Sequence, residues 1–544
     1  MSSNTGPTRR SPSRHRRPLR GFLAALVLLA AGCTTPIVGP ETGAPGGAAA
    51  SSPGRAGTAL GADRIQIVHT NDIHGHMDVT DKVASGTSTF AQGGLVATAA
   101  QIERLRAQAP ERTLLLDGGD AWQGTYISNE NKGQAITKIM SLLRYDAQVV
   151  GNHDFDWGTE NLRQRATEAS FPFLCANCAE STGAVPSYLK PYIVKDLGLV
   201  KVAIIGLILP DAASIIKASS IAGIHFTDTA KTLRAHLPQM RKEADLIVAL
   251  THIGLDNDRK IASEVPELDV IVGGHSHTAL RAAVTVGKTV IVQTGAYTAN
   301  LGDLELVIDP ASKAVIAVPT RSNELLAVAS TTAPPSDVRT QITAIVDDRR
   351  AAGKKYTERI VGRTINPLDN PRAECGLGNL VTDGLLEYGR QQGWKSDIAF
   401  YNMAGVRASL PAGEITYGQL YQVLPFTNVV VSVDLTGTQL RAVFEAASGT
   451  AGRLHVGGGT FSYKLTNPSG QRLVAATVGG TAIDPARVYH VVTIDYLLTG
   501  GDGHTEFKSG TNVIFGDIEV DAVSAYMTAH SPVDPKVEGR IVQQ

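Results

Sequence analysis

Apolar residues recur along residues 63–323 with two alternating periods. Short apolar runs with strand character, such as residues 65–68 and 246–250, alternate with stretches whose apolar positions recur every three to four residues, such as 94–106, 133–143, 160–169 and 229–243. Alternating strands and helices are typical of an α/β domain, in which helices pack on the faces of a sheet. We therefore predict an α/β domain over residues 63–325.

A second unit follows this domain. A polar helical pattern covers residues 335–354, and Ser336 precedes its first turn as a candidate N-cap. Beyond it, a helical pattern at 377–391 and strand patterns at 397–401, 429–435 and 488–494 indicate a second, α+β domain. We predict a linker helix within residues 326–356 and the second domain over residues 357–544.

Five of the predicted strands are followed at once by His, Asp or Asn. One such side chain is usually structural, but loops at one end of a layered sheet can bring residues that are distant in sequence to one point. Imidazole and carboxylate ligands without thiolate suit Zn²⁺ or Mn²⁺, with Mg²⁺ or Ca²⁺ as the alternatives. The residues are Asp72 and His74, Asp117 and Asp120, Asn152, His153 and Asp154, His252, and His275 and His277.

Residues 1–33 have the pattern of a targeting segment. Four arginines between positions 14 and 20 precede an apolar stretch, 21–31, that is too short to cross a bilayer. The small residues before Cys33 resemble a bacterial lipobox, which implies cleavage before Cys33 and a lipid on it; a plain secretory signal peptide is the alternative. We expect an extracytoplasmic protein that is lipid-anchored to the bacterial cell membrane, or secreted or periplasmic if the lipobox is not used.

Composition narrows the set of partners. Residues 34–62 are rich in Gly, Ala, Pro, Ser and Thr and predict a disordered tether. Six of the 50 basic residues lie in residues 1–33, which leaves 44 basic against 51 acidic residues, a net charge of −7. This balance does not favour a nucleic-acid polymer as a partner, and no later segment is apolar and long enough to span a membrane. The sequence leaves the oligomeric state open.

The cysteines after residue 33 are few. Cys175 and Cys178 form a Cys-x-x-Cys, for which a local disulfide is the simplest interpretation in an exported protein; a zinc site would need further ligands. Cys375 has no obvious partner and is expected to be a small buried side chain.

The ordered strand-end motifs resemble those of the calcineurin-like metallophosphoesterases, and residues 69–76 and 151–156 are similar to the 5′-nucleotidase branch of that family. The resemblance implies a four-layer α/β/β/α N-terminal domain with two divalent metal ions. Such a pair generates hydroxide at neutral pH and neutralises the phosphoryl group. The motifs are Asp72-Ile73-His74, Gly119-Asp120, Gly151-Asn152-His153-Asp154, Thr251-His252 and Gly274-His275-Ser276-His277.

The same resemblance implies a role for each motif residue. Asp120 would bridge two metals, His153 would donate to phosphate oxygens as catalytic residue, and Asp156 would hold the His153 ring; a turn residue is the alternative for Asp156. Asn71 and Asp154 would orient the metal ligands. The implied ligands are Asp72, His74, Asp120 and His277 for the first metal and Asp120, Asn152, His252 and His275 for the second.

Motifs in the second domain resemble the nucleotide-binding C-terminal domain of 5′-nucleotidases. They are Glu374-Cys375-Gly376-Leu377-Gly378-Asn379-Leu380, Asn402-Met403-Ala404-Gly405-Val406-Arg407, Leu424-Pro425-Phe426 and Gly500-Gly501-Asp502-Gly503. The implied substrate-binding residues are Phe426 and Tyr496 on the two faces of the base, Asp502 at the ribose hydroxyls, Arg407 and Arg372 at phosphate, and Asn402. Tyr496 stands where Phe is commoner, and core packing is the alternative for Phe426.

The expected function is an extracytoplasmic dimetal phosphohydrolase that releases phosphate from nucleoside 5′-monophosphates. Two activities share the metal motifs and stay open as alternatives: a 2′,3′-cyclic-nucleotide 2′-phosphodiesterase with 3′-nucleotidase activity, and a UDP-sugar diphosphatase. A non-catalytic surface lipoprotein that binds nucleotides is the alternative outside the enzymes.

Overall fold

The computed structural model describes residues 60–78, 81–85, 88–216, 218–319, 323–328, 334–449 and 453–544. The predicted signal segment with Cys33, and the tether up to residue 59, lie outside the described residues. None of the helices in the described part of the chain combines the length and apolarity that a bilayer crossing requires.

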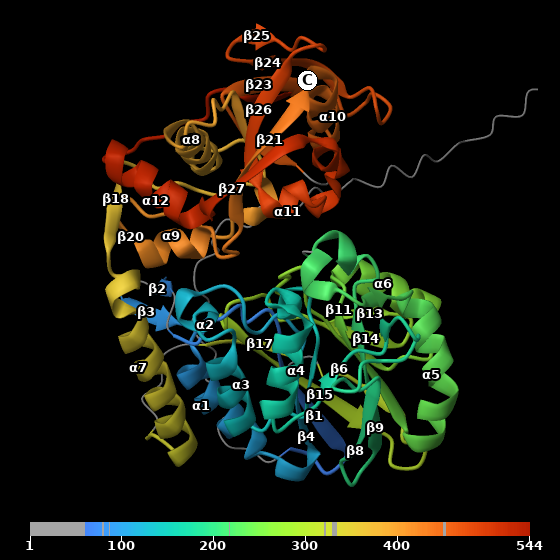
Figure 1. Ribbon diagram of the computed structural model, residues 1–544. Helices are drawn as coiled ribbons and strands as arrows, with labels where there is room; N and C mark the ends of the chain where they lie inside the picture. The colour runs from blue at the N-terminus through green and yellow to red at the C-terminus, as the bar shows by residue number, and fades with distance from the viewer. Residues whose placement is uncertain are drawn as a thin grey trace, which may run out of the picture. The chain divides into compact units, whose positions relative to one another are not determined.

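Two β-sheets form the middle of the N-terminal domain (Figure 1). The first has the order β16-β15-β1-β4-β5-β6, with β17 paired to β15, and the second has the order β13-β14-β12-β11-β9-β8. The strands of the first sheet are β1 (Arg64–Thr70), β4 (Thr113–Asp117), β5 (Ala147–Val149), β6 (Phe173–Leu174), β15 (Asn300–Ile308), β16 (Val315–Ala317) and β17 (Asn323–Ala327). Those of the second are β8 (Tyr192–Asp196), β9 (Lys201–Ile208), β11 (Leu246–His252), β12 (Val270–Val272), β13 (Val284–Val286) and β14 (Thr289–Val292).

The two sheets pack face to face, and helices cover their outer faces. Ile65 and Leu114 of the first sheet share a core with Val202 and Leu250 of the second. One group of helices packs on the first sheet and another on the second, so the predicted α/β/β/α layering is confirmed. The helices are α1 (Leu95–Arg106), α3 (Gln134–Leu142) and α4 (Gly158–Glu168) on the first sheet, and α5 (Thr229–Glu243) and α6 (Leu255–Glu264) on the second.

The predicted linker helix is α7 (Asp337–Thr357), and it begins where the sequence indicates. The Ser336 hydroxyl accepts the Arg339 backbone N–H at 3.1 Å, which is the N-cap bond. Ile342 and Val346 of α7 are buried in the same core as the helices on the first sheet. The helix therefore packs as part of the N-terminal domain rather than standing apart from it.

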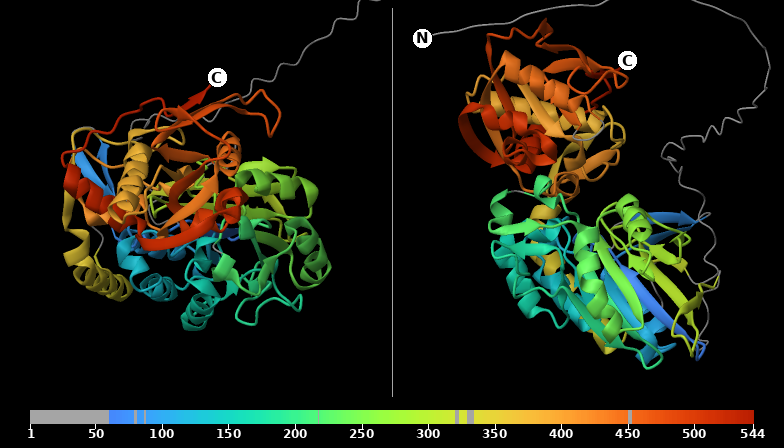
Figure 2. Two further views of the ribbon diagram at one scale, coloured as in Figure 1. Left: turned by 45° about the horizontal axis from the view of Figure 1, so that its top comes forward. Right: turned by 90° about the vertical axis from the view of Figure 1, so that its right-hand side faces the viewer.

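The second domain has the predicted α+β character (Figures 1 and 2). Its main sheet has the order β22-β19-β26-β21-β27, and α8, α10 and α12 share one core with it. The elements are α8 (Gly376–Gln391), α10 (Gly437–Ala447) and α12 (Glu519–His530), with β19 (Ile398–Asn402), β21 (Val429–Thr436), β22 (Leu454–Gly457), β26 (Val488–Ile494) and β27 (Thr511–Ile518).

Smaller elements complete the described chain. They are the strands β2 (Asp81–Ser85), β3 (Ser88–Gln92), β7 (Cys178–Glu180), β10 (Ile224–Phe226), β18 (Ile360–Thr364), β20 (Gly413–Thr416), β23 (Gly459–Tyr463), β24 (Leu473–Val478), β25 (Thr481–Ala482) and β28 (Ile541–Gln543), and the short helices α2 (Tyr126–Asn129), α9 (Tyr417–Val423) and α11 (Asp495–Leu498).

The cysteines behave as the sequence suggests. Cys175 and Cys178 are joined by a disulfide, and both are buried. Cys375 is a free, buried thiol at the N-cap of α8, where the Gly378 backbone N–H donates to its Sγ at 3.3 Å. The disulfide excludes a zinc site on the Cys-x-x-Cys pair.

The strand directions decide where polar loops can meet. Strands β1, β4 and β5 run parallel to one another, as do β11 and β12 in the other sheet. Their carboxyl ends therefore lie along one edge of each sheet, and all five polar loops predicted from the sequence leave from these edges.

Candidate metal centre

Asp72, His74 and His277 form the first of two clusters with ligand atoms close enough to hold one ion. The Nε2 atoms of His74 and His277 lie 3.1 Å apart, and His277 Nε2 lies 3.3 Å from Asp72 Oδ1. The His74 Nδ1–H donates to the Gln123 carbonyl at 2.9 Å, which leaves the Nε2 lone pair of His74 directed at the cluster. His74 and Asp72 are buried, and His277 is partly buried.

Asp120, His252 and His275 form the second cluster. His252 Nδ1–H donates to the Gly118 carbonyl at 2.7 Å, which directs its Nε2 at Asp120 Oδ2, 3.0 Å away. Burial lowers the pKa of His252, but the Asp120 carboxylate and other neighbours raise it by more, to about 10, so a cation, either a proton or a metal ion, is favoured between Nε2 and that carboxylate. The Asn152 amide oxygen lies 3.0 Å from His275 Nδ1 and is a candidate oxygen ligand on this side.

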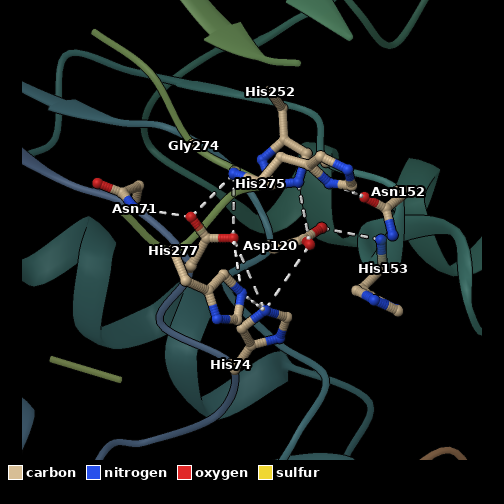
Figure 3. A network of polar contacts seen from close by, with 12 residues as sticks. Asn71, His74, Asp120, Asn152, His153, His252, Gly274, His275 and His277 are labelled. Atoms are coloured by element: carbon tan, nitrogen blue, oxygen red, sulfur yellow. Dashed lines mark hydrogen bonds and ion pairs between the residues drawn. The ribbon is translucent and has the colours of Figure 1, made fainter. Parts of the chain in front are cut away.

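The Asp120 carboxylate lies between the two clusters (Figure 3). Its Oδ2 is 3.0 Å from His252 Nε2 in the second cluster and 3.8 Å from His74 Nε2 in the first. One carboxylate within reach of both sets of imidazoles can serve two ions at once. The nitrogen and oxygen donors and the absence of thiolate in both clusters suit divalent Zn²⁺ or Mn²⁺.

The backbone at these loops is held in an uncommon conformation. Five of the candidate ligands have a positive φ: Asp72 (51°), His74 (47°), Asp120 (57°), His275 (76°) and His277 (52°). Residues with a Cβ adopt this left-handed region rarely, and such strain persists only where the surrounding structure enforces it. Two backbone hydrogen bonds cross-link the loops, from Asp72 N–H to the Gly119 carbonyl and from His74 N–H to the Asp120 carbonyl, both at 2.9 Å.

Glycines let the loops approach one another this closely. A Cβ at Gly151 would lie 2.1 Å from Asp120 Oδ1, and a Cβ at Gly274 would lie 2.4 Å from the Gly118 carbonyl oxygen. Any side chain at Gly151 or Gly274 would push an adjacent ligand out of place. The glycines of the Gly-Asn-His-Asp and Gly-His-Ser-His motifs are therefore part of the site's geometry.

Two buried polar residues hold the metal-ligand loops. The Asp154 carboxylate accepts the backbone N–H groups of Gly151, Asp120 and Ala121 at 2.9, 3.2 and 3.3 Å. Burial, and next the Asp120 carboxylate, raise the pKa of Asp154 to about 7. The Asn71 amide donates to Asp72 Oδ2 at 2.6 Å and so fixes the orientation of that carboxylate.

His153 is adjacent to the centre without belonging to either cluster. Its Nδ1–H donates to Asp156 Oδ2 at 3.0 Å, and its backbone N–H donates to Asp120 Oδ1 at 2.8 Å. Burial lowers the pKa of His153, but the Asp156 and Asp120 carboxylates raise it by more, so its net pKa lies above the ordinary value. The bond to Asp156 occupies Nδ1, so Nε2 is the ring nitrogen that is left for another contact.

Two predicted residues of the second domain lie beside His153. The Phe426 ring centroid is 5.2 Å from that of His153, and the Arg407 guanidinium is 5.7 Å from the Phe426 ring centroid. The segment before Phe426 is bonded to the N-terminal domain, since the Gln123 side chain donates to the Pro425 carbonyl at 3.1 Å. Phe426 is only partly buried, which does not favour the core-packing alternative.

Three other predicted residues form a group of their own. Tyr496 and Asn402 both donate to the Asp502 carboxylate at 2.8 Å. Burial contributes most to the raised pKa of Tyr496, followed by the Asp502 carboxylate and then by Asp156. The contribution of Asp156 shows that this group lies near the residues beside the metal centre. Arg372 is exposed before α8, and its role stays a prediction.

Sequence reasoning did not find Tyr297. Its ring centroid lies 5.7 Å from that of His74, 5.4 Å from that of His277 and 4.5 Å from that of His76. Tyr297 also has a positive φ of 62°. The loop after β14 contains no His or Asp, so the strand-end pattern that revealed the other loops could not reveal this one.

Comparison with known proteins extends over both domains. The calcineurin-like phosphoesterase family matches residues 65–279, and the 5′-nucleotidase C-terminal domain family matches residues 357–509. The 5′-nucleotidase of Homo sapiens is 30% identical over 536 residues, a match that covers 89% of this chain and 91% of the human protein. This chain belongs to the 5′-nucleotidase family.

Two further relatives agree with this assignment. A crystal structure of a 5′-nucleotidase precursor from Thermus thermophilus superposes with a TM-score of 0.80 at 30% identity, covering 88% of this chain and 99% of the other. An apyrase from Tabanus yao is 29% identical over 535 residues, covering 88% of this chain and 93% of the apyrase. As a family member, the chain is a metal-dependent phosphoric monoester hydrolase.

Proposed function

We propose that this chain is a nucleotide phosphohydrolase that releases the 5′-phosphate of nucleoside monophosphates. The observation that carries the proposal is the distance of 5.2 Å between the rings of Phe426 and His153. The Phe426 ring of the second domain, on which a base can stack, therefore lies beside His153 at the metal centre of the N-terminal domain. Both domains match families of the same enzyme class.

In this proposal the two clusters hold two divalent ions. When bound, the ions supply a nucleophile at neutral pH and neutralise negative charge on the phosphoryl group. The first ion would be held by Asp72, His74, Asp120 and His277, and the second by Asp120, Asn152, His252 and His275. Zn²⁺ and Mn²⁺ suit these ligands best, with Mg²⁺ and Ca²⁺ as alternatives.

His153 acts on the phosphate in this account. The Asp156 carboxylate accepts the Nδ1–H bond at 3.0 Å, so Nε2–H is left to donate to a phosphate oxygen. Donors that are already oriented stabilise the charge that develops on phosphate oxygens in the transition state. Asp156 has a second effect, because its negative charge opposes the lowering of the His153 pKa by burial.

The second domain selects a nucleotide in this account. Phe426 and Tyr496 stack on the base, Asp502 accepts hydrogen bonds from ribose hydroxyls, and Asn402 supports Asp502. Arg407 lies over the Phe426 ring and is placed to meet the phosphate with its planar guanidinium. Stacking tolerates every base, so we expect broad use of purine and pyrimidine nucleotides.

The name of one relative suggests a second candidate, hydrolysis of nucleoside di- and triphosphates. The apyrase from Tabanus yao covers almost the same part of this chain as the 5′-nucleotidases do. Phosphate release from ADP and ATP, measured beside release from AMP, distinguishes the two candidates.

A substrate panel on metal-stripped protein, reconstituted with one divalent ion at a time, tests the proposal. We expect fast phosphate release from AMP and slow or no turnover of 2′,3′-cyclic AMP and UDP-glucose. Strong cleavage of either of these two without AMP hydrolysis would contradict the proposal and favour an alternative activity. Nucleotide binding without turnover on any metal would favour the non-catalytic lipoprotein.

We also propose that the protein is exported and held at the cell membrane by a lipid on Cys33. The support is the sequence pattern of residues 1–33 alone. Cys33→Ser should release the active protein from the membrane fraction, whereas unchanged fractionation would contradict the anchor.

A further inference from the structure

Both oxygens of the Asp502 carboxylate are held by neighbouring side chains. The Tyr496 hydroxyl donates to Oδ1 at 2.8 Å, and the Asn402 amide donates to Oδ2 at 2.8 Å. The Asp502 backbone N–H donates back to the Tyr496 hydroxyl at 3.1 Å. Three bonds therefore fix the plane in which the carboxylate lies.

The backbone around Asp502 is also shaped by the tyrosine ring. Asp502 has a φ of 53°, in the left-handed region that residues with a Cβ rarely adopt. The preceding residue packs flat on the ring, because a Cβ at Gly501 would lie 2.4 Å from Tyr496 Cε1. Tyr496 thus supports both the side chain and the strained backbone of Asp502.

The held carboxylate keeps acceptor capacity on each oxygen. An ionised carboxylate offers about four lone-pair positions, two per oxygen. The bonds from Tyr496 and Asn402 use one position on each oxygen. The two that remain point from one rigid plane and suit two neighbouring hydroxyl groups, such as the 2′- and 3′-hydroxyls of a ribose.

We propose that Tyr496 and Asn402 are positioning residues that make Asp502 selective for ribonucleotides over 2′-deoxyribonucleotides. This inference rests on the proposed function, in which Asp502 meets the sugar. Phe at position 496 would keep the ring for stacking but would release Oδ1 and the Asp502 backbone N–H. The carboxylate could then rotate, and the advantage of a second hydroxyl on the substrate would decrease.

The test compares kcat/KM for AMP with kcat/KM for 2′-deoxy-AMP on the metal-loaded enzyme. In Tyr496→Phe we expect the ratio of the two values to fall about fivefold to tenfold, the share of one hydrogen bond of ordinary strength. The loss should appear mainly as a higher KM for AMP, since the group acts on sugar binding. Near-UV circular dichroism and thermal unfolding establish that the variant is folded.

The chain offers a matched control in Tyr388→Phe. The Tyr388 hydroxyl donates to Asp517 Oδ2 at 3.0 Å and accepts the Asp517 backbone N–H at 2.7 Å, the same arrangement in another part of the domain. Loss of that hydroxyl should leave the ratio for the two nucleotides unchanged. A general effect of losing a tyrosine–aspartate bond is thereby separated from the effect at Asp502.

Asn402→Ala provides a second route, because it frees the other oxygen and should also lower the ratio. If Tyr496→Phe does not fold, the same ratio is measured in Asn402→Ala instead. A ratio that is unchanged from wild type in a folded variant, with both nucleotides hydrolysed, would overturn the inference. Failure of the wild-type enzyme to hydrolyse AMP at all would instead overturn the proposed function, and the selectivity with it.

Discussion

The Asp154 carboxylate accepts the backbone N–H of Asp120 at 3.2 Å, so a buried acid outside both clusters holds the loop of the candidate bridging ligand. The same carboxylate accepts the Gly151 N–H at 2.9 Å from the next loop. Asp154 therefore ties together two of the loops that carry metal ligands. Such supporting contacts orient ligands and contribute to metal affinity.

Asp154→Asn should weaken metal binding about 10-fold to 100-fold, because the amide presents an NH₂ group to backbone N–H donors. Titration of metal-free protein with Zn²⁺ or Mn²⁺ measures this change. Asp269→Asn is the control, because the Asp269 carboxylate also accepts a backbone N–H, that of Ile247 at 2.8 Å. Asp269 precedes the amino end of β12 and so lies at the end of that strand that is far from the clusters. Equal metal affinity in Asp154→Asn and wild type would show that Asp154 does not support the ligands.

His153→Ala should retain both metal ions and lose about 100-fold or more in kcat, because a positioned proton donor contributes at least that much. Elemental analysis of the purified variant and its kcat on AMP are the two measurements. His225→Ala, at an exposed position in β10, controls for loss of a histidine. Unchanged turnover in His153→Ala would refute the role assigned to this ring.

Phe426→Leu should raise KM for AMP by about fivefold to 100-fold, the range expected for loss of stacking on a base. Hydrolysis of p-nitrophenyl phosphate, which has no base, should change much less. Phe426→Tyr keeps the aromatic face and should behave like wild type. If Phe426 served mainly in packing, Phe426→Leu would instead lower the melting temperature and affect both substrates equally.

We expect the buried His455 ring to lower the free energy of unfolding in mild acid relative to neutral pH. Its ring is fully buried under α8, where a Cβ at Gly378 would lie 2.2 Å from it, and burial lowers the pKa of His455 from 6.5 to about 4. As the pH falls below 6.5, the unfolded chain takes up a proton that the folded chain does not, so stability is lost between pH 6.5 and 4. We expect His455 to account for about 3 kcal/mol of that loss.

Urea unfolding of metal-free protein at about pH 7 and about pH 4.5, values that bracket most of this interval, measures the contribution. His455→Gln removes the titrating group, so its free energy of unfolding should fall less than that of wild type over this interval. His225→Gln, at an exposed site, should follow wild type. The same pH dependence in His455→Gln and wild type would contradict the buried, neutral state of the His455 ring.

The strands, the helices and the polar strand ends could be predicted from local signals in the sequence, whereas the four-layer arrangement and the division of the ligands into two clusters were implied by the family resemblance. Alternating apolar periods indicated the strands and helices, and α5 and β26 have the predicted bounds. The strand-end residues Asp72, His74, Asp120 and His252 could be found because the carboxyl ends of parallel strands share an edge.

Other features depend on contacts that no local pattern records. The positive φ of His275 and of Asp120 depends on contacts between loops that leave two different sheets. Tyr297 approaches His74 and His277 only after the loop beyond β14 folds back over the first cluster. The hydrogen bond from Tyr496 to Asp502 forms only because the backbone at Gly501 packs on the Tyr496 ring. The residue types alone do not reveal this contact.

The central claim is that Asp120 joins two metal ions in a nucleotide phosphohydrolase. It is tested most directly by titrating metal-free protein with Mn²⁺ while bound metal and phosphate release from AMP are measured together. We expect wild type to bind two ions per chain, AMP hydrolysis to appear as the second ion binds, and Asp120→Ala to bind fewer than two ions. Full activity with one ion per chain, or two tightly bound ions in Asp120→Ala, would contradict it.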